Sequence, residues 1–207
     1  MRTLKIFLFL LPTLVLAQKS QLSNAEMQSF KQEVAQHAED LKTLSSEFTQ
    51  TKYMQLMEGE AVSEGKLYYR NPDVLKWEYH DPYNYKILFM DGQLHLDDNG
   101  KKSHTSLRSN KLFGKLVSLI SGSVNGKLLE DPENFEVTYS RNGNNIEAVI
   151  IPTDPSLKDM FSEIILLFNG EYLVDSVKLM EDSGDFTLIN FRNISINKSI
   201  DEKIFQP

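Results

Sequence analysis

Apolar and polar residues alternate along the middle of the chain in the way that half-buried strands require. Between residues 74 and 80, Leu75, Trp77 and Tyr79 share one face of an extended chain, and the opposite face is mostly polar. Residues 84–91 and 93–98 repeat the alternation with further aromatic and aliphatic side chains. The pattern predicts a sheet with one strongly apolar, aromatic face across three successive strands.

Turn signals divide the chain into segments of strand length. Pairs such as Asp91-Gly92 and Asn142-Gly143 supply the positive φ that tight hairpins use. No helices alternate with these segments, so we expect an antiparallel meander rather than a parallel sheet. Eleven strands are predicted, near residues 45–57, 62–70, 74–80, 84–91, 93–98, 101–106, 135–140, 145–151, 161–168, 172–181 and 185–195.

An amphipathic helix is predicted over residues 23–44, before the first strand. Its opening sequence SNAE, Ser23 to Glu26, fits a capping box, in which hydroxyl and carboxylate satisfy the first free amides. Phe30 and Val34 lie on an apolar stripe with helical spacing.

A second amphipathic helix is predicted over residues 109–122, between two halves of the sheet. Leu112, Phe113 and Leu116 lie on its apolar side, and Gly114 lowers its stability by about 1 kcal/mol relative to Ala. The sequence is compatible with a fixed packing helix and with a movable lid. A single helical turn is also expected at residues 156–159.

A strongly twisted antiparallel sheet of about eleven strands tends to curl, and its apolar face then becomes the concave one. Two helices offer little material to fill such a concavity, which favours a hydrophobic groove partly covered by helices. A core filled by the protein's own side chains is the alternative, and physical reasoning alone leaves both open.

The N-terminal segment has the pattern of a secretory signal peptide. Arg2 and Lys5 precede an apolar run from Ile6 to Leu16 that is too short to span a bilayer, and the small residue Ala17 follows. We expect residues 1–17 to be removed, leaving residues 18–207 as a single domain outside the cytoplasm.

The mature chain is expected to be acidic and free of cysteine chemistry. Removing two of the 22 basic residues leaves 20 against 29 acidic residues, a net charge of −9. This balance argues against a nucleic-acid partner. With no Cys in the chain, a disulfide and a lipidated N-terminal Cys are excluded.

Patterns typical of enzymes are weak. There is no G-x-S-x-G motif and no glycine-rich phosphate loop, and the four histidines lack metal-ligand spacing. We therefore expect no catalytic residues, no metal and no cofactor. An envelope hydrolase stays as a lesser alternative, because carboxylates distant in sequence can still meet.

A set of short motifs occurs in an order that resembles the periplasmic outer-membrane lipoprotein carrier family, the LolA-like proteins. The resemblance extends over nearly all of the mature chain and is strongest over residues 45–98. Its elements are Phe48-x-Gln50, Gly65, Pro72, Trp77-x-Tyr79, Pro82, Asp91-Gly92 and the closing sequence IDEKIFQP.

The resemblance implies an incomplete, strongly curved antiparallel β-barrel whose helices cover a concave hydrophobic face. It also implies a monomeric periplasmic carrier that shields the acyl chains of lipoproteins, accepting them from an inner-membrane release complex and delivering them to an outer-membrane acceptor. A carrier of another lipid or hydrophobic intermediate is the alternative. The family often has Arg before the second-strand proline, where it latches the lid helices; here Asn71 holds that position and Arg70 precedes it, so both are latch candidates.

The expected acyl-binding residues come from the apolar face and from both helices. A one-residue error of register in strands 62–70 or 84–91 would exchange the strand residues for their neighbours. The set is Leu67, Tyr69, Leu75, Trp77, Tyr79, Tyr85, Ile87 and Phe89 from the sheet, with Phe30, Val34, Leu112, Phe113 and Leu116 from the helices.

Overall fold

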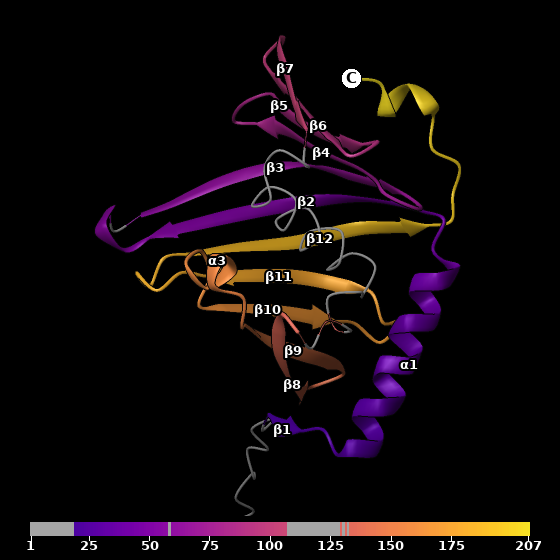
Figure 1. The fold of residues 1–207 in the computed structure, drawn as a ribbon, viewed down its shortest axis with the longest axis vertical. Helices are drawn as coiled ribbons and strands as arrows, with labels where there is room; N and C mark the ends of the chain where they lie inside the picture. The colour runs from indigo at the N-terminus through magenta and orange to yellow at the C-terminus, as the bar shows by residue number, and fades with distance from the viewer. Residues whose placement is uncertain (1–18, 58, 107–128, 130, 132) are drawn as a thin grey trace, which may run out of the picture.

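The computed structural model describes residues 19–57, 59–106, 129, 131 and 133–207 and consists mainly of strands (Figure 1). One long helix, α1 (Asn24–Asp40), and one short helix, α3 (Pro155–Lys158), accompany them, together with the 3-10 turns η1 (Gln55–Met57) and η4 (Glu202–Phe205). The strands are β1 (Ser20–Gln21), β2 (Thr43–Met54), β3 (Gly59–Arg70), β4 (Val74–Asp81), β5 (Tyr85–Met90), β6 (Gln93–Asp98), β7 (Lys101–Ser106), β8 (Phe135–Asn142), β9 (Asn145–Pro152), β10 (Glu163–Phe168), β11 (Val174–Met180) and β12 (Phe186–Ile196).

All of these strands belong to one antiparallel sheet with the order β1-β8-β9-β10-β11-β12-β2-β3-β4-β5-β6-β7. The predicted mainly β fold is confirmed: each of the eleven predicted strands corresponds to one of β2 to β12, and β1 is an additional strand of two residues. The pairing of β12 with β2 joins the end of the chain to its first long strand. Within the described residues β1 and β7 end the order, so the sheet is open and curved (Figure 1).

Helix α1 begins as predicted but ends earlier. The Ser23 hydroxyl accepts a hydrogen bond from the Glu26 amide, and the Glu26 carboxylate accepts one from the Ser23 amide, so the capping box is present. The helix ends at Asp40 instead of residue 44, because Leu41 is extended and β2 begins at Thr43. Leu41 precedes β2 and Leu44 is its second residue, and both side chains are buried.

Two predictions concern residues outside the described part of the chain. The signal peptide over residues 1–17 is one, and the helix over residues 109–122, with Leu112, Phe113 and Leu116, is the other. Within the residues that are described, no helix combines the length and the apolar character needed to cross a bilayer.

The main hydrophobic core covers one face of the sheet, here called the inner face. Its fully buried members include Phe48 on β2, Leu67 on β3, Leu166 and Phe168 on β10, and Phe30 on α1. A smaller cluster of Val74, Leu88 and Phe205 lies on the opposite, outer face, where η4 packs against β4 and β5. The sheet therefore carries the main core on its inner face and anchors the C-terminal η4 turn on its outer face.

Candidate functional site

An aromatic cluster lies at the centre of the inner face, across β2, β3 and β4. The ring centroids of Phe48 and Trp77 are 4.4 Å apart, and the Tyr79 ring meets Phe48 edge-on at 5.3 Å. The Tyr79 hydroxyl donates a hydrogen bond of 2.9 Å to Oε1 of Gln50, and Phe48 pairs with Gly65 in the β2–β3 register. Five residues of the sequence motifs thus meet in one place.

Gly65 makes this cluster possible. A β-carbon at this position would lie 2.2 Å from the backbone oxygen of Glu78 and 2.4 Å from Cζ of Phe48. Both distances are shorter than any ordinary contact between a β-carbon and another heavy atom. The Phe48 ring occupies the space that a side chain at position 65 would need, and its own side chain is completely buried. The aromatic residue on one strand and the glycine on the next therefore form one packing unit.

Strands β3, β4 and β5 continue the inner face in regular rows. Leu67, Trp77 and Ile87 are successive partners across the three strands, and Tyr69, Leu75 and Phe89 form the next row. The register has no one-residue shift along these rows, so the predicted residues do share a face. Leu67, Tyr69, Leu75, Trp77 and Phe89 are buried, whereas Tyr79, Tyr85 and Ile87 are half-buried.

Sequence reasoning missed the other half of the inner face. Strands β8 to β12 contribute many further residues to the same hydrophobic core. The available signal was the uninterrupted apolar run IILLF at residues 164–168, in which the structure buries Ile164, Leu166 and Phe168. The residues concerned are Val137, Tyr139, Ala148, Ile150, Ile164, Leu166, Phe168, Val177, Ile189 and Phe191.

Helix α1 covers this second half rather than β3 to β5. Phe30 meets the rings of Phe168 at 5.1 Å and Tyr139 at 5.7 Å, both in edge-to-face geometry. Phe30 and Val34 are only 2% and 5% exposed. The structure therefore places Phe30 and Val34 on the inner face, and the edge-to-face ring contacts of Phe30 are with β8 and β10 instead of the predicted residues of β3 to β5.

Polar contacts fix both ends of α1. At its start, the Glu26 carboxylate pairs with the Arg141 guanidinium at 3.1 Å, and hydrogen bonds from Ser23, together with Arg141, lower the pKa of Glu26. At its end, Nδ2 of Asn71 donates to the Leu41 carbonyl at 3.0 Å, and Nδ2 of Asn197 donates to the Asp40 carbonyl at 3.1 Å.

The two latch candidates lie on different surfaces. Asn71 contacts the end of α1, as described, so it does join a covering helix to the sheet by a hydrogen bond. Arg70 points to the outer face, where it pairs with Glu202 and its guanidinium lies 4.7 Å from the centroid of the Phe205 ring. In the described residues Arg70 fastens the C-terminal η4 turn and not a helix of the inner face.

The inner face also contains buried polar groups. Burial raises the pKa of Tyr79 to about 12 and raises the pKa of Tyr139 further still. The Tyr139 hydroxyl has no hydrogen-bond partner among the described residues. The Trp77 indole lies close to the Tyr79 hydroxyl and opposes the rise in the pKa of Tyr79. The indole N–H of Trp77 nevertheless has no hydrogen-bond partner among the described residues.

Small cavities remain between the described elements of the inner face. One of about 50 Å³ lies between α1 and the sheet, bordered by Val34, Phe168 and Tyr172, and one of about 10 Å³ lies beside Leu67 and Phe191. A single water needs about 10–15 Å³ of such volume, so these cavities hold a few water molecules at most and neither accommodates an acyl chain unless the covering groups move.

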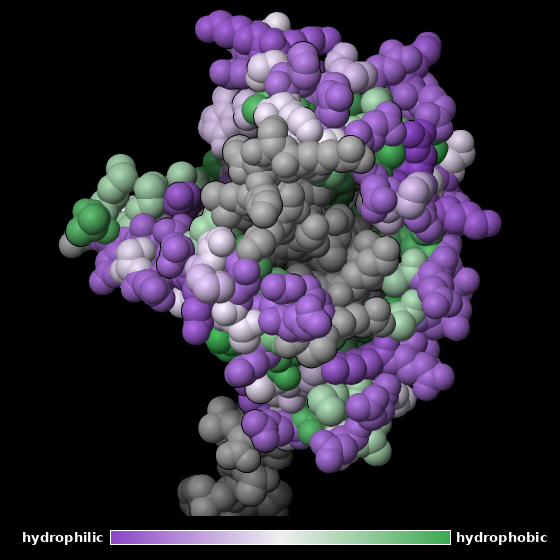
Figure 2. All heavy atoms as spheres, in the orientation of Figure 1, coloured by the Kyte–Doolittle hydropathy of each residue, from purple (hydrophilic) through white to green (hydrophobic). Residues whose placement is uncertain are grey.

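The described surface in one view is largely polar, with an apolar projection. Where Figure 2 is coloured, charged and polar side chains predominate, and apolar ones gather at the projecting β2–β3 hairpin. At that hairpin, Leu56 is fully exposed and Met57 is 71% exposed. Among the described residues, no three His, Cys, Asp or Glu side chains converge in a way that could hold a metal ion.

Comparison with known proteins decides the family. The family model described as "Outer membrane lipoprotein carrier protein LolA" matches residues 39–207. The chain belongs to the LolA family. The resemblance expected from the Phe48, Gly65 and Trp77 motifs is therefore confirmed.

Curated relatives agree with this assignment, and a solved structure shares the fold. The outer-membrane lipoprotein carrier protein of Pseudomonas aeruginosa is 22% identical over 195 residues, covering 92% of this chain and 88% of the relative. That of Hahella chejuensis is 27% identical over 169 residues, covering 80% and 78%. The structure of the Pseudomonas aeruginosa MucA/MucB complex contains a chain similar in fold, with a TM-score of 0.52, 10% identity and coverage of 88% of this chain and 61% of that one.

Proposed function

We propose that this LolA-family protein is a periplasmic carrier that shields the acyl chains of lipoproteins on its inner face. In this function it accepts lipoproteins from an inner-membrane release complex and transfers them to an outer-membrane acceptor without covalent chemistry. The observation that carries the proposal is the continuous apolar inner face of an open sheet, with the aromatic cluster around Trp77 at its centre. The family membership supports the cargo class.

The energetics of the cargo favour an open sheet with a displaceable cover. Burial contributes about 0.8 kcal/mol per methylene. Forty methylenes would give about 30 kcal/mol, beyond the ceiling of about 20 kcal/mol for non-covalent affinity. A carrier that must release its cargo should bury only about ten to fifteen methylenes, and opening the cover offsets part of that gain.

Helix α1 is the described element suited to act as the cover. Its apolar contact with the sheet is concentrated at Phe30 and Val34, and the small cavity beside Val34 marks looser packing under its second half. The hydrogen bond from Asn71 to the Leu41 carbonyl holds its end without a charged partner. In our proposal the cargo displaces Phe30 from the inner face and takes its place.

The test is recovery of acylated proteins with the carrier from the cell envelope. We expect the wild-type chain, purified from the periplasm, to retain lipoproteins that carry acyl groups. Ile87→Asn places a polar group on the inner face at a half-buried position, and we expect it to reduce recovery at least severalfold. Lys66→Asn, an exposed position on the outer face of β3, is the matched control and should leave recovery unchanged.

Two results would contradict the carrier function. One is the absence of acylated protein under conditions in which an established carrier recovers it. The other is an equal loss from the Ile87 and Lys66 variants, which would indicate damage unrelated to the inner face. Delivery is tested separately, by incubating the loaded protein with outer-membrane and inner-membrane vesicles and measuring where the cargo is found.

A carrier of another hydrophobic molecule is the second candidate, and Asn71 favours it. An uncharged side chain stands at the latch position and makes a single hydrogen bond to the cover helix, so retention differs from that provided by a cationic latch. Mass spectrometry of material extracted from the purified protein separates the candidates. Acyl-modified peptides support lipoprotein cargo, whereas a free lipid or pigment precursor supports the alternative.

A further inference from the structure

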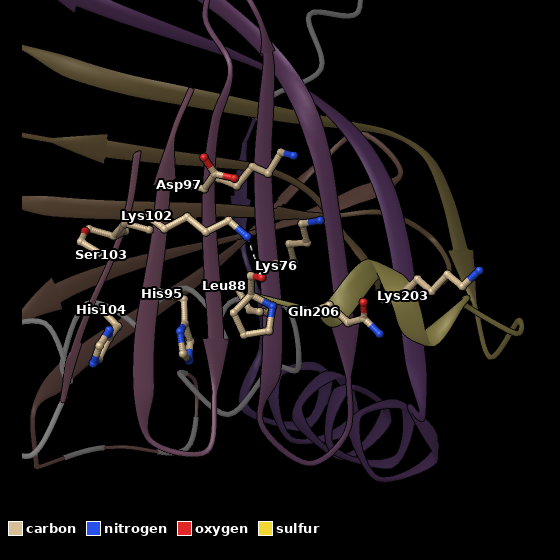
Figure 3. A pocket seen from close by; sticks show the side chains of 12 residues that line it. Lys76, Leu88, His95, Asp97, Lys102, Ser103, His104, Lys203 and Gln206 are labelled. Carbon is tan, nitrogen blue, oxygen red and sulfur yellow. Dashed lines mark hydrogen bonds between the residues drawn. The ribbon is translucent and has the colours of Figure 1, made fainter. Parts of the chain in front are cut away.

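A groove with a volume of about 410 Å³ lies on the outer face, opposite the inner face, between β4 to β7 and the C-terminal segment (Figure 3). We call it the outer groove. Lysine and histidine side chains dominate its lining: Lys76, Lys86, Lys102, Lys203, His95 and His104.

The outer groove is locally basic on an acidic protein. The chain as a whole carries a net charge of −7. Four lysines border the groove, against Asp97 in its wall and Glu78 beside it, which lies 3.4 Å from both Lys76 and Lys86. Even with the histidines neutral, the groove keeps an excess of positive charge.

The chain itself shows how the groove receives an oxygen atom of a polypeptide. Nζ of Lys102 donates a hydrogen bond of 3.0 Å to the backbone oxygen of Pro207 (Figure 3). Pro207 reaches this position because η4 is anchored on the outer face by Phe205, which is 3% exposed. His95 and His104 lie side by side on β6 and β7, directly opposite in the register, with ring centroids 6.1 Å apart.

We propose that the outer groove docks an acidic, extended segment of a protein partner. Its carboxylates would meet the lysine ammonium groups, and its backbone oxygens would take positions like that of Pro207. A polypeptide segment fits better than a membrane surface, because the groove is recessed and the Lys76 side chain is only 11% exposed. A planar layer of lipid headgroups would reach only the rim.

The position of the groove separates docking from cargo binding. Strands β4 and β5 present Trp77 and Ile87 to the inner face and Lys76 and Lys86 to the outer face, since successive residues of a strand point in opposite directions. A partner in the outer groove therefore leaves the inner face free. Docking is available to the protein with or without cargo, and this inference does not depend on the proposed carrier function.

The experiment measures fluorescence anisotropy with a labelled octapeptide of alternating Asp and Ser, added to the purified mature chain. The same peptide with Lys in place of Asp is the control ligand. We expect binding of the acidic peptide that weakens as salt is raised, because the contacts are ionic. The Lys86→Gln/Lys102→Gln variant should bind about tenfold more weakly, since it removes two ionic contacts.

A matched variant controls for overall charge. Lys158→Gln/Lys198→Gln removes the same charge from exposed positions elsewhere and should bind within about twofold of wild type. Lys86→Arg/Lys102→Arg keeps the charge and should also bind normally, and an unchanged urea midpoint of the Gln variant excludes misfolding as the cause of the loss. Equal weakening in both Gln variants, or no binding of the acidic peptide to wild type, would overturn the proposal.

Vesicles containing phosphatidylglycerol test whether the outer groove binds anionic lipid headgroups instead of an acidic peptide. The proposal predicts that such vesicles sediment the wild-type and the Lys86→Gln/Lys102→Gln proteins equally. If instead the vesicles recruit wild type and not the variant, while the peptide does not bind, the outer groove would be a membrane-contact site and the peptide proposal would be wrong.

Discussion

Replacing Gly65 with alanine tests the packing unit at the centre of the inner face. The added β-carbon would lie 2.2 Å from the Glu78 backbone oxygen and 2.4 Å from the Phe48 ring. One of these neighbours is backbone inside the sheet, and the other is a completely buried ring that meets Trp77, so neither can yield cheaply.

The expected loss of stability combines two opposing effects. Overpacking of a dense core costs about 1–3 kcal/mol, and severe contact with backbone places this site at the upper end. Loss of glycine flexibility in the unfolded chain offsets about 0.4–1 kcal/mol. We expect a net decrease of about 2 kcal/mol in the free energy of unfolding. In a chain of this size this corresponds to a fall of about 4–8 °C in Tm.

Urea denaturation followed by tryptophan fluorescence measures this change at the site itself. Trp77 is the only tryptophan in the chain, and its ring lies 4.4 Å from Phe48. Gly170→Ala is the matched control, because nothing lies within 4 Å of a β-carbon there, and it should change stability by less than about 0.5 kcal/mol. A second variant, Phe48→Leu combined with Gly65→Ala, should lose less stability than the sum of the two single variants, because the smaller side chain removes one of the two clashes.

The reasoning would be refuted if Gly65→Ala unfolded at the same urea concentration as wild type. It would also be refuted if Gly65→Ala and Gly170→Ala were destabilised equally. Either result would mean that Phe48 and Gly65 are not a tightly packed unit in solution.

Three further predictions concern polar groups around the inner face. Asn71→Ala removes the hydrogen bond to the Leu41 carbonyl and should cost about 1 kcal/mol in urea unfolding, whereas a change within error would show that Asn71 does not hold α1. Capping interactions lower the pKa of Glu26, so its stabilising effect is present above the ordinary carboxyl pKa and is lost as the pH falls through the lowered value. The stability difference between wild type and Glu26→Gln should therefore shrink in acid, and a difference that is constant from neutral pH to pH 3 would contradict this. Burial raises the pKa of Tyr79 to about 12. The contribution of the Tyr79 hydroxyl to folding stability is therefore complete below about pH 10 and declines as the pH rises toward 12. Tyr79→Phe, which also loses the hydrogen bond to Gln50, should show a smaller loss of stability in alkali than wild type.

Several features of the fold follow from local sequence alone. Alternation through residues 74–98 requires strands with one apolar face, because successive side chains of a strand point in opposite directions. Asp91 adopts φ of 52° and Gly92 adopts 71°, the positive values that the Asp-Gly pair indicates for a tight turn. The SNAE sequence marks the start of α1 for an equally local reason, since its two hydrogen bonds span only three residues.

The candidate site was predicted only in part. The residues of β3 to β5 were expected on one face, and the register places them there. The contributions of β8 to β12 were missed, because the pairing of β12 with β2 joins residues 133 to 152 positions apart, from Phe186–Tyr53 to Ile196–Leu44, and no local pattern reports it. The location of Phe30 against Phe168 and Tyr139 was likewise beyond the sequence, since helical spacing shows which side of α1 is apolar and not which strands it covers.

The sequence by itself determined the strands, their turns, the capped helix and the family motifs, because each depends on neighbours within a few residues. Only the tertiary structure decided that Phe48 fills the space beside Gly65, that Asn71 binds the end of α1 while Arg70 serves the outer face, and that lysines of four chain segments border one groove. These facts depend on strand order and curvature, and the free energy that selects them comes from contacts between residues far apart in the chain.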